Sequence, residues 1–291
     1  MIQFPHLHIT LSGVGNHITV LGFKIAFYGM IIGLGILAGI LFACFTAKIT
    51  GQKIDNYIDL ALYGIIVSIL GARAYYVIFS WSYYSKHPKE ILDIRGGGLA
   101  IYGGVLTAIL FVIIYSKLKK VSTLMLMDSV AVGLVVGQAI GRWGNFFNRE
   151  AFGEYTNGLF AMRLPINDVR FSDVTPLMDK HVQVIKGVSY IQVTPTFLFE
   201  SIGCLCIFLF LIFYFKHKKF NGEIFFYYIG LYGVLRFFIE RLRTDQLRIG
   251  NTKIAVSEVV AVCLVIVAII GLALNYRDVL KGKVNKSNIK E

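Results

Sequence analysis

The sequence predicts an all-α polytopic membrane protein that crosses the bilayer seven times. Of its 291 residues, 56% are hydrophobic and only 16% are charged, and the mean hydropathy is +0.67. A soluble domain usually has about 25% charged residues. The apolar residues also gather in blocks of about 18 residues or more, the length that a helix needs to cross the hydrocarbon core of a membrane.

Seven apolar blocks follow one another along the chain. They cover residues 20–46, 57–79, 99–116, 124–146, 195–215, 223–241 and 253–275. The third block is short, and the sixth contains Arg236 and Glu240, so these two are the least regular spans. Because no internal repeat is visible, we expect a single membrane domain that comprises residues 1–291.

The basic residues between the blocks predict the orientation. Thirteen Lys and Arg residues lie in one alternating set of segments, and seven lie in the short segments of the other set. Loops rich in Lys and Arg stay in the cytoplasm, so we expect the N-terminus outside and the C-terminus, with its basic tail 277–291, inside. The first residues lack the basic start, apolar core and cleavage site of a signal peptide, so we expect the first block to remain in the mature protein.

The longest polar stretch, residues 147–194, lies between the fourth and fifth blocks. It holds five basic and five acidic residues. Two of its segments, LPINDVRFSDVTPLMD and VQVIKGVSYIQVTP, have the pattern of short strands and turns. We therefore expect a small lobe that faces outward from the helical membrane body.

Composition disfavours several other classes. The net charge of +12 comes from short basic loops without a nucleic-acid motif, so we expect no nucleic-acid partner. The cysteines Cys44, Cys204, Cys206 and Cys263 lie in apolar blocks without zinc or redox spacing, which favours simple packing. No group of His, Cys and Asp has the spacing of metal ligands, so the sequence predicts neither a metal nor another cofactor.

Ionisable residues inside membrane segments are costly, and they usually mark function or a paired interior. Those in the blocks or at their ends are Arg73, Asp128, Arg142, Glu150, Glu200, Arg236 and Glu240. Most of them lie toward the outward ends, so we expect a polar pocket facing the outer leaflet. Arg236 and Glu240 also fit a structural ion pair on one helix face, and Asp128 fits a helix cap or an interface charge.

A glycine-rich segment accompanies these charges. Residues 95–104, RGGGLAIYGG, contain five glycines around Tyr102. Such glycines allow close helix packing, which is the commoner use, or an irregular backbone that lines a cavity. Arg73, in the segment GARAYYVIF, fits either a phosphate anchor or the partner of a carboxylate.

Residues 141–153, GRWGNFFNREAFG, resemble the signature of the prolipoprotein diacylglyceryl transferase family. The signature reads G-R-x-G-N-F-x-N-x-E-x-x-G, and its fixed positions are met by Gly141, Arg142, Gly144, Asn145, Phe146, Asn148, Glu150 and Gly153. Other segments agree in order, namely FYGMIIGLGILAG (27–39), GARAYYVIF (71–79), GGLAIYGG (97–104), TPTFLFES (194–201) and LRFFIERLRTDQ (235–246). The resemblance covers nearly the whole chain and implies seven spans with the N-terminus outside.

The resemblance implies an enzyme of the bacterial plasma membrane with its active site toward the outer leaflet. Such an enzyme moves a diacylglyceryl group from phosphatidylglycerol, a cosubstrate, to the lipobox cysteine thiol of a preprolipoprotein. The products are a thioether-linked prolipoprotein and glycerol phosphate. The implied partners are therefore phosphatidylglycerol, the signal peptide that carries the lipobox, and the bilayer.

The residues that this resemblance implies are Tyr28, Arg142, Asn145, Asn148, Glu150, Gly153, Arg236 and Glu240, and we add Arg73, Tyr102, Gly103 and Gly104 to the expected site. We interpret Arg142 and Arg236 as a clamp for the phosphate, because a guanidinium group binds two phosphate oxygens and stays charged. One such donor contributes about 3 kcal/mol to transition-state stabilisation. The asparagines would orient the substrate, and Glu150 and Glu240 would hold the arginines or contact substrate hydroxyls.

One position departs from the family pattern. Tyr102 stands where the family commonly has a histidine before paired glycines, and all six histidines, His6, His8, His17, His87, His181 and His217, lie outside the blocks. Three routes to the substrate thiolate stay open. Nearby arginines lower the thiol pKa from about 8.5, Glu150 accepts the proton, or Tyr102 takes part, although a phenol with a pKa near ~10 is a poor base.

An anion transporter and another outer-leaflet phospholipid enzyme are the competing interpretations. Intramembrane arginines and glycine-broken helices also occur in transporters. Against that class, the chain has no repeated half, and its charges gather toward one face of the membrane. An intramembrane serine protease is disfavoured because no apolar block contains a histidine.

Overall fold

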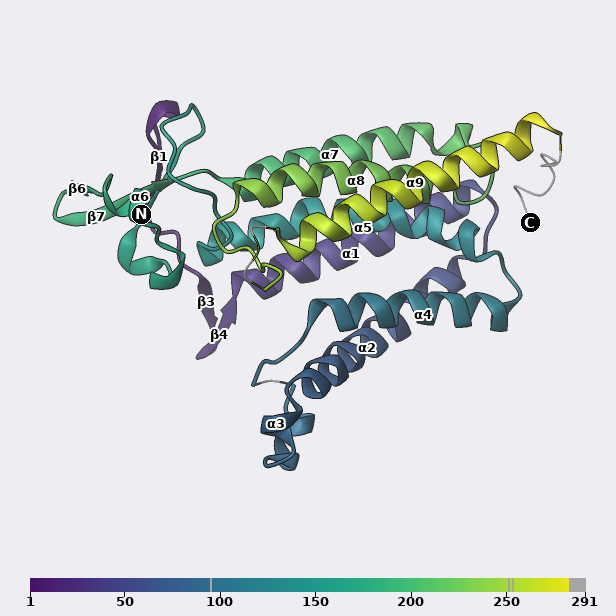
Figure 1. The fold of residues 1–291 in the computed structure, drawn as a ribbon, viewed down its shortest axis with the longest axis horizontal. Helices are drawn as coiled ribbons and strands as arrows, with labels where there is room; N and C mark the ends of the chain where they lie inside the picture. Colours follow the sequence, from purple (N-terminus) through teal and green to yellow (C-terminus); the bar gives the residue numbers. More distant parts are fainter. Residues whose placement is uncertain (95, 251, 253, 283–291) are drawn as a thin grey trace.

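The computed structural model describes residues 1–94, 96–250, 252 and 254–282. Its long helices are α1 (Phe27–Ile49), α2 (Ile54–Phe79), α4 (Ile101–Lys119), α5 (Thr123–Asn148), α7 (Thr196–Tyr214), α8 (Glu223–Leu242) and α9 (Val256–Leu280). The short helices α3 (Trp81–Tyr84) and α6 (Pro176–Asp179) lie in connections. Figure 1 shows α1, α5, α7, α8 and α9 as one bundle, with α2 and α4 paired at its side.

Each of the seven predicted blocks corresponds to one long helix. Within the described residues, six helices are long and apolar enough to cross a membrane, namely α1, α2, α4, α5, α7 with the turn that follows it, and α9. Helix α8 is not among them, because Glu223, Arg236, Glu240 and Arg241 lie within its 20 residues. It nevertheless packs along α9, α7 and α5. The helical, polytopic body is thus confirmed with six candidate spans.

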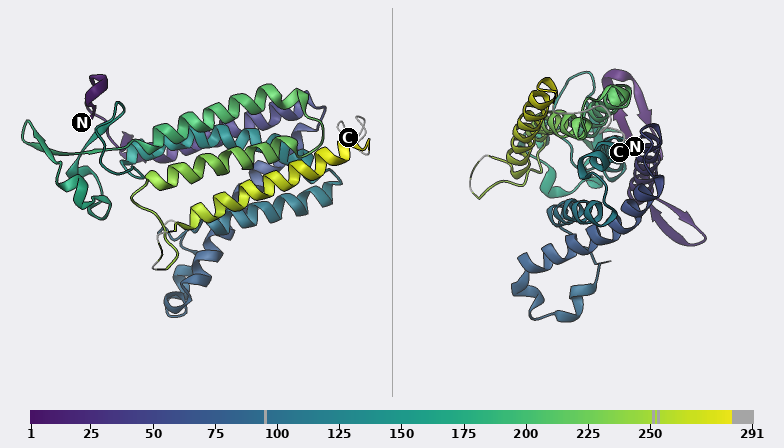
Figure 2. Two further views of the ribbon diagram at one scale, coloured as in Figure 1. Left: turned by 45° about the horizontal axis from the view of Figure 1, so that its top comes forward. Right: turned by 90° about the vertical axis from the view of Figure 1, so that its right-hand side faces the viewer.

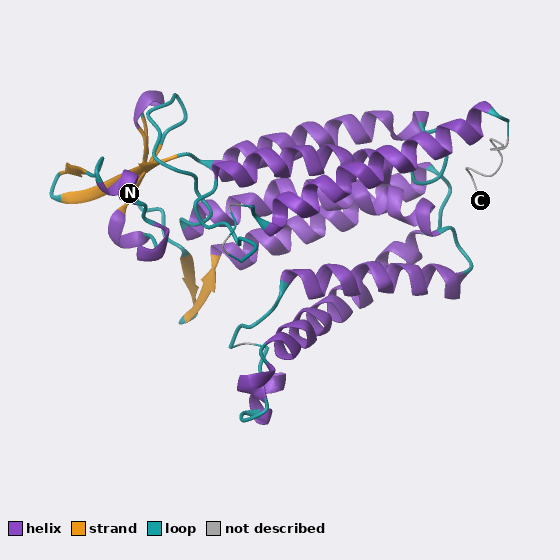
Figure 3. Cartoon of the chain, in the orientation of Figure 1, coloured by secondary structure: helices purple, strands orange, loops and turns teal. Residues whose placement is uncertain are grey.

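The all-α prediction is incomplete, because the lobe is built on a sheet (Figure 3). The antiparallel strands have the order β2 (Ile9–Leu11), β1 (Ile2–Phe4), β5 (Met162–Pro165), β7 (Val188–Val193) and β6 (Gln183–Ile185). The strands expected within 147–194 are present, and the first residues of the chain pair with them. The lobe and the C-terminal end of α9 lie at opposite ends of the bundle (Figure 2).

The first membrane helix begins later than predicted. The apolar block was expected from residue 20, but α1 begins at Phe27. Before it, β3 (His17–Val20) and β4 (Phe23–Ala26) form an antiparallel hairpin. Composition alone does not distinguish a β-hairpin from the start of a membrane helix, because the β-branched and aromatic residues of such a hairpin are as apolar as those of a span.

Helices α1 and α5 meet along a line of glycines. A Cβ atom added to Gly133 would lie 2.4 Å from the carbonyl oxygen of Gly39, and one added to Gly137 would lie 3.1 Å from that of Gly35. Two helices approach this closely only where side chains are absent, a common packing mode in membranes. We call this line the glycine seam; it fixes the position of α5 against α1.

The predicted cap at Asp128 is confirmed near the start of α5. The buried Asp128 carboxylate accepts hydrogen bonds from Lys218 Nζ at 2.9 Å and from the backbone N–H groups of Gly222 at 2.9 Å and Phe225 at 3.0 Å. A carboxylate at this place satisfies free N–H groups at the N-terminus of α8 and interacts favourably with its dipole. This contact joins α8 to α5, which carries the signature.

Candidate active site

Two arginines and one glutamate from three helices form the centre of the site. Glu200, in the second turn of α7, is only 1% exposed. Its Oε1 atom lies 2.9 Å from Nη2 of Arg142 on α5, and its Oε2 atom lies 3.2 Å from Nη1 of Arg236 on α8. One carboxylate thus holds two guanidinium groups side by side. The sequence marked Glu200 as ionisable, but this bridging role was missed.

Two further residues of α8 complete this arginine cluster. Glu240 Oε2 accepts from Arg236 Nη2 at 2.6 Å, which is the ion pair indicated by their spacing of four residues. The Tyr232 hydroxyl donates to Glu200 Oε1 at 3.2 Å. We define the arginine cluster as Arg142, Glu200, Tyr232, Arg236 and Glu240. Its two cations are matched by two carboxylates.

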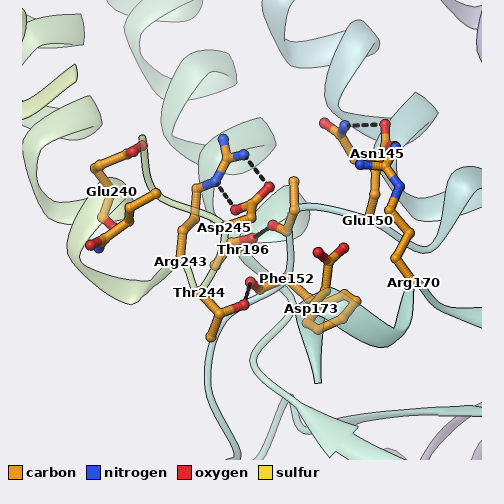
Figure 4. Close-up of polar contacts among 12 residues, drawn as sticks. Asn145, Glu150, Phe152, Arg170, Asp173, Thr196, Glu240, Arg243, Thr244 and Asp245 are labelled. Atoms are coloured by element: carbon orange, nitrogen blue, oxygen red, sulfur yellow. Dashed lines mark hydrogen bonds and ion pairs between the residues drawn. The ribbon is translucent and has the colours of Figure 1, made fainter. Parts of the chain in front are cut away.

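The polar residues of the signature extend this cluster toward the lobe (Figure 4). Arg142 Nη1 donates to Asn145 Oδ1 at 3.3 Å, and Asn145 Nδ2 donates to Glu150 Oε1 at 3.0 Å. Asn148 Nδ2 reaches the same Glu150 oxygen at 3.4 Å, and Glu150 Oε2 pairs with Arg170 of the lobe at 3.0 Å. The signature therefore provides a continuous polar path from the helices to the lobe.

The chain leaves α5 through a tight turn that Gly153 completes. Arg149 and Ala151 have φ angles of 51° and 58°, in the left-handed region. The N–H group of Gly153 donates to the Thr194 carbonyl at 2.9 Å, and a Cβ atom there would lie 2.5 Å from the carbonyl oxygen of Leu242. Because only glycine fits between these segments, Gly153 joins the signature to the residues that follow α8.

Those residues contribute a pair that the sequence analysis missed. Arg243 Nε and Nη2 donate to the two carboxylate oxygens of Asp245 at 2.9 and 2.8 Å, and Arg243 lies within electrostatic range of Glu240 and Arg142. Partial burial alone raises the pKa of Asp245, but the hydrogen bonds and charge of Arg243 outweigh burial and lower it below its ordinary value. The available signal was an R-x-D sequence that begins three residues after Glu240.

Tyr102, at the start of α4, lies near enough to Glu240 and Arg236 for their charges to act on its hydroxyl. That Tyr102, the position that departs from the family pattern, belongs to the same site stays a prediction. Gly103 and Gly104 face α2 instead, where added Cβ atoms would lie 2.7 and 3.3 Å from backbone carbonyl oxygens. Their observed use is the packing of α4 on α2, and their contact with a substrate stays a prediction.

Tyr28, in the first turn of α1, packs on Gly144 of the signature. A Cβ atom at Gly144 would lie 2.8 Å from the Tyr28 ring, and one at Gly141 would lie 3.4 Å from Ile32. These two glycines thus continue the glycine seam to the end of α5. Tyr28 is 37% exposed, so its ring lies beside Gly144 with part of its surface open.

Arg73 holds a connecting segment. Its guanidinium group donates to the backbone carbonyls of Ile91 at 2.8 Å, Gly97 at 2.7 Å and Glu90 at 2.5 Å. Within the part of the chain that the structure describes, it forms no ion pair with a carboxylate. The observed role of Arg73 is to fasten the segment between α3 and α4 to α2, and its use as a phosphate anchor stays a prediction.

Metal-ligating residues and histidines do not gather at this site. No group of three or more His, Cys, Asp or Glu residues that could hold a metal ion occurs among the described residues. His217 ends the candidate span Thr196–His217. It lies 17 residues beyond Glu200, which corresponds to roughly 25 Å of helix. His217 is therefore too remote from the arginine cluster to act as its base.

The fold and the site together define a class: a polytopic membrane protein in which paired arginines, held by carboxylates between helices, form a candidate anion site. The family described as prolipoprotein diacylglyceryl transferase matches residues 16–274. The phosphatidylglycerol–prolipoprotein diacylglyceryl transferase of Finegoldia magna is 42% identical over 260 residues, which are 89% of this chain and 94% of that protein.

Two further relatives carry the same name. The protein from Clostridioides difficile is 40% identical over 273 residues, 94% of this chain and 97% of that protein. The protein from Bacillus licheniformis is 41% identical over 241 residues, 83% of this chain and 84% of that protein. The chain belongs to the prolipoprotein diacylglyceryl transferase family.

Proposed function

We propose that this protein transfers the diacylglyceryl group of phosphatidylglycerol to the lipobox cysteine thiol of preprolipoproteins, the first step of lipoprotein modification. The observation that carries the proposal is the Glu200 carboxylate between Arg142 and Arg236. It holds two phosphate-binding groups together in the helical body, where a phospholipid is available from the bilayer. The family relationship supports the same reaction.

The reaction is a displacement at a glyceryl carbon. The cysteine sulfur forms a new C–S bond while the bond from that carbon to the phosphate oxygen breaks. The electron pair leaves on glycerol phosphate, and the thiol proton passes to a base or to water. Because the leaving group departs as an anion, stabilising its charge is the main catalytic requirement, and positioned donors contribute most to such a step.

Arg142 and Arg236 are suited to this requirement. Their side chains are 22% and 17% exposed, so each keeps some N–H surface while Glu200 fixes its position. Donors held in advance need little reorganisation when charge develops. Asn145 and Glu150 lie next along the polar path, where we expect them to bind the glycerol hydroxyls or the peptide backbone.

The arginines also affect the pKa of the substrate thiol. Cations near a cysteine lower its pKa from about 8.5, which increases the fraction of nucleophilic thiolate. A carboxylate such as that of Glu150, on the same polar path, is available to take the proton, whereas the Tyr102 hydroxyl is suited to a hydrogen bond with the phosphate or the thiol. Phosphatidylglycerol is a cosubstrate, and the proposed chemistry uses no further cofactor.

We also propose seven spans, with the N-terminus outside and the arginine cluster toward the outer leaflet of the bacterial plasma membrane. The 20 residues of α8 correspond to roughly 30 Å of helix, enough to cross the hydrocarbon core. Its Arg236 and Glu240 charges are paired within the bundle, which lowers their cost in a membrane. The bias of basic loop residues supports the orientation.

The test is transfer by purified protein from phosphatidylglycerol labelled in its acyl chains to a lipobox peptide. Arg142→Gln and Arg236→Gln remove one donor each, and Arg277→Gln is the matched control, because Arg277 is 59% exposed near the end of α9. We expect transfer by the wild type and the control, and a loss of about a hundredfold in the other two.

Two results would count against this proposal. Wild-type transfer in either Arg142→Gln or Arg236→Gln would contradict the phosphate clamp. If the folded wild type transfers no label to the peptide, the assigned reaction is wrong, and anion uptake into proteoliposomes would then test the transporter interpretation. Melting curves of each purified variant show whether a loss of transfer reflects unfolding.

A further inference from the structure

A second polar cavity lies outside the arginine cluster. Its volume is about 690 Å³, and its lining includes Glu154, Arg241, Arg243, Gln246 and Arg248. These residues come from the turn that follows α5, from the last turn of α8 and from the connection between α8 and α9. The volume lies within the usual range for small-molecule sites.

This outer cavity adjoins the arginine cluster. Gln246 Nε2, on its wall, donates to the backbone carbonyl of Glu240 at 2.6 Å. Arg243, also on its wall, lies within electrostatic range of Arg142. In the view of Figure 4, Arg243 lies between Glu240 and the Glu150 carboxylate. The outer cavity therefore lies beside the Glu240 end of the arginine cluster.

The charged residues in the lining of the outer cavity are three arginines, Arg241, Arg243 and Arg248, and two glutamates, Glu154 and Glu258. Arg241 pairs with Glu258 at 3.1 Å, and Arg243 pairs with Asp245 at 2.8 Å. Arg248 donates only to a side-chain amide oxygen at 3.4 Å and has no carboxylate partner among the described residues. Arg248 thus supplies a cation without an ion-pair partner to a polar space of ligand size, and the carboxylate of Glu154 in the same lining accepts a hydrogen bond from the Thr175 hydroxyl.

We propose that the outer cavity binds glycerol phosphate, the leaving group, on its way to the aqueous phase. This inference rests on the proposed function. The diacylglyceryl product stays in the bilayer, whereas glycerol phosphate is small, polar and soluble. A phosphate monoester carries a charge of about −1.5 to −2 near pH 7, more than the phosphodiester from which it forms. An unmatched arginine outside the cluster therefore favours the product over the lipid.

The test compares product inhibition with substrate affinity. Arg248→Gln removes the unmatched cation, and Arg277→Gln is again the control. We expect the inhibition constant of added glycerol phosphate to rise about three- to fivefold in Arg248→Gln, the size expected for one partly exposed charge. The KM for phosphatidylglycerol should stay unchanged, as should both constants in the control.

The head group of phosphatidylglycerol also contains a phosphate. The inhibition constant of glycerol phosphate and the KM for phosphatidylglycerol together show which of the two molecules the cavity binds. A rise of the phosphatidylglycerol KM that matches the rise of the inhibition constant would assign the cavity to the lipid head group and overturn the inference. An unchanged inhibition constant, or a wild type that millimolar glycerol phosphate does not inhibit, would also overturn it.

Calorimetric titration of glycerol phosphate into the purified full-length protein needs no activity. Weaker binding by Arg248→Gln than by the wild type supports the cavity even if transfer to the peptide fails, and equal binding contradicts it. The failure of this inference is therefore distinguishable from the failure of the proposed function.

Discussion

Replacing Glu200 by glutamine tests how the two arginines are held. The amide keeps the shape of the side chain, and its oxygen can still accept from Arg142 or from Tyr232. Its NH2 group, however, meets the guanidinium group of Arg236 as donor against donor. Because two carboxylates match two arginines in the wild type, the substitution leaves one buried cation without a counter-charge.

The expected effect falls on kcat and not on KM. Breaking a buried ion pair costs about 3–5 kcal/mol in general, and a misplaced catalytic donor costs about 3 kcal/mol, or roughly a hundredfold in rate. We therefore expect kcat to fall about a hundredfold in Glu200→Gln. The KM for phosphatidylglycerol should stay level or fall, because a negative charge next to the phosphate site has been removed.

The assay is label transfer at several phosphatidylglycerol concentrations, with a melting curve for each variant. Glu200→Asp keeps the charge but shortens the side chain by one methylene, so it should retain intermediate activity. If Glu200 acts through Arg142, the double variant Glu200→Gln/Arg142→Gln should lose little more than Arg142→Gln alone. A wild-type kcat in Glu200→Gln, together with an inactive Arg142→Gln, would refute the bridge.

Three further substitutions test other parts of the site. Gly144→Ala places a methyl group 2.8 Å from the Tyr28 ring, an overpacked contact of about 1–3 kcal/mol, so transfer should fall about tenfold or more, and an unchanged rate would contradict this packing. Tyr102→Phe should retain transfer, because a phenol with a pKa near ~10 is a poor base; a loss that Tyr102→His restores would instead make it a proton-handling position. The lowered pKa of Asp245 beside Arg243 stabilises the folded state above the unfolded pKa of about 3.9 and ceases to do so as pH falls through the folded value. The melting-temperature difference between the wild type and Asp245→Asn should therefore be constant from about pH 5 to 8 and shrink below about pH 4, whereas a difference that grows toward acid pH would oppose this reasoning.

The helical body was predictable because a membrane imposes a minimum apolar length on every span. The spacing of Arg236 and Glu240 likewise indicated their pair, since residues four apart share a helix face. The sheet of the lobe was only partly predictable. Gln3 pairs with Arg163 across 160 residues, and local patterns carry no information about a partner so distant.

In the candidate site, too, contacts between neighbouring residues were predictable and contacts between distant residues were not. The signature marked Arg142, Asn145 and Glu150, which hydrogen-bond to one another along a few residues of the chain. The bridging role of Glu200 depends on three helices that meet only in the folded protein. Arg243 joins the site because Gly153 admits the backbone of the segment after α8, a contact visible only in three dimensions.

The glycine seam gives the signature a second meaning. Gly141 and Gly144 alternate with the polar signature residues Arg142 and Asn145, yet the atoms nearest to the two glycines belong to α1. A side chain at Gly144 would collide directly with the Tyr28 ring, whereas one at Gly141 would only touch Ile32. The glycines of the motif therefore set how α5 packs on α1, in addition to the polar contacts that its other residues make. A single methyl group at Gly144, far too small to block a lipid, is expected to displace Tyr28 of α1 relative to α5.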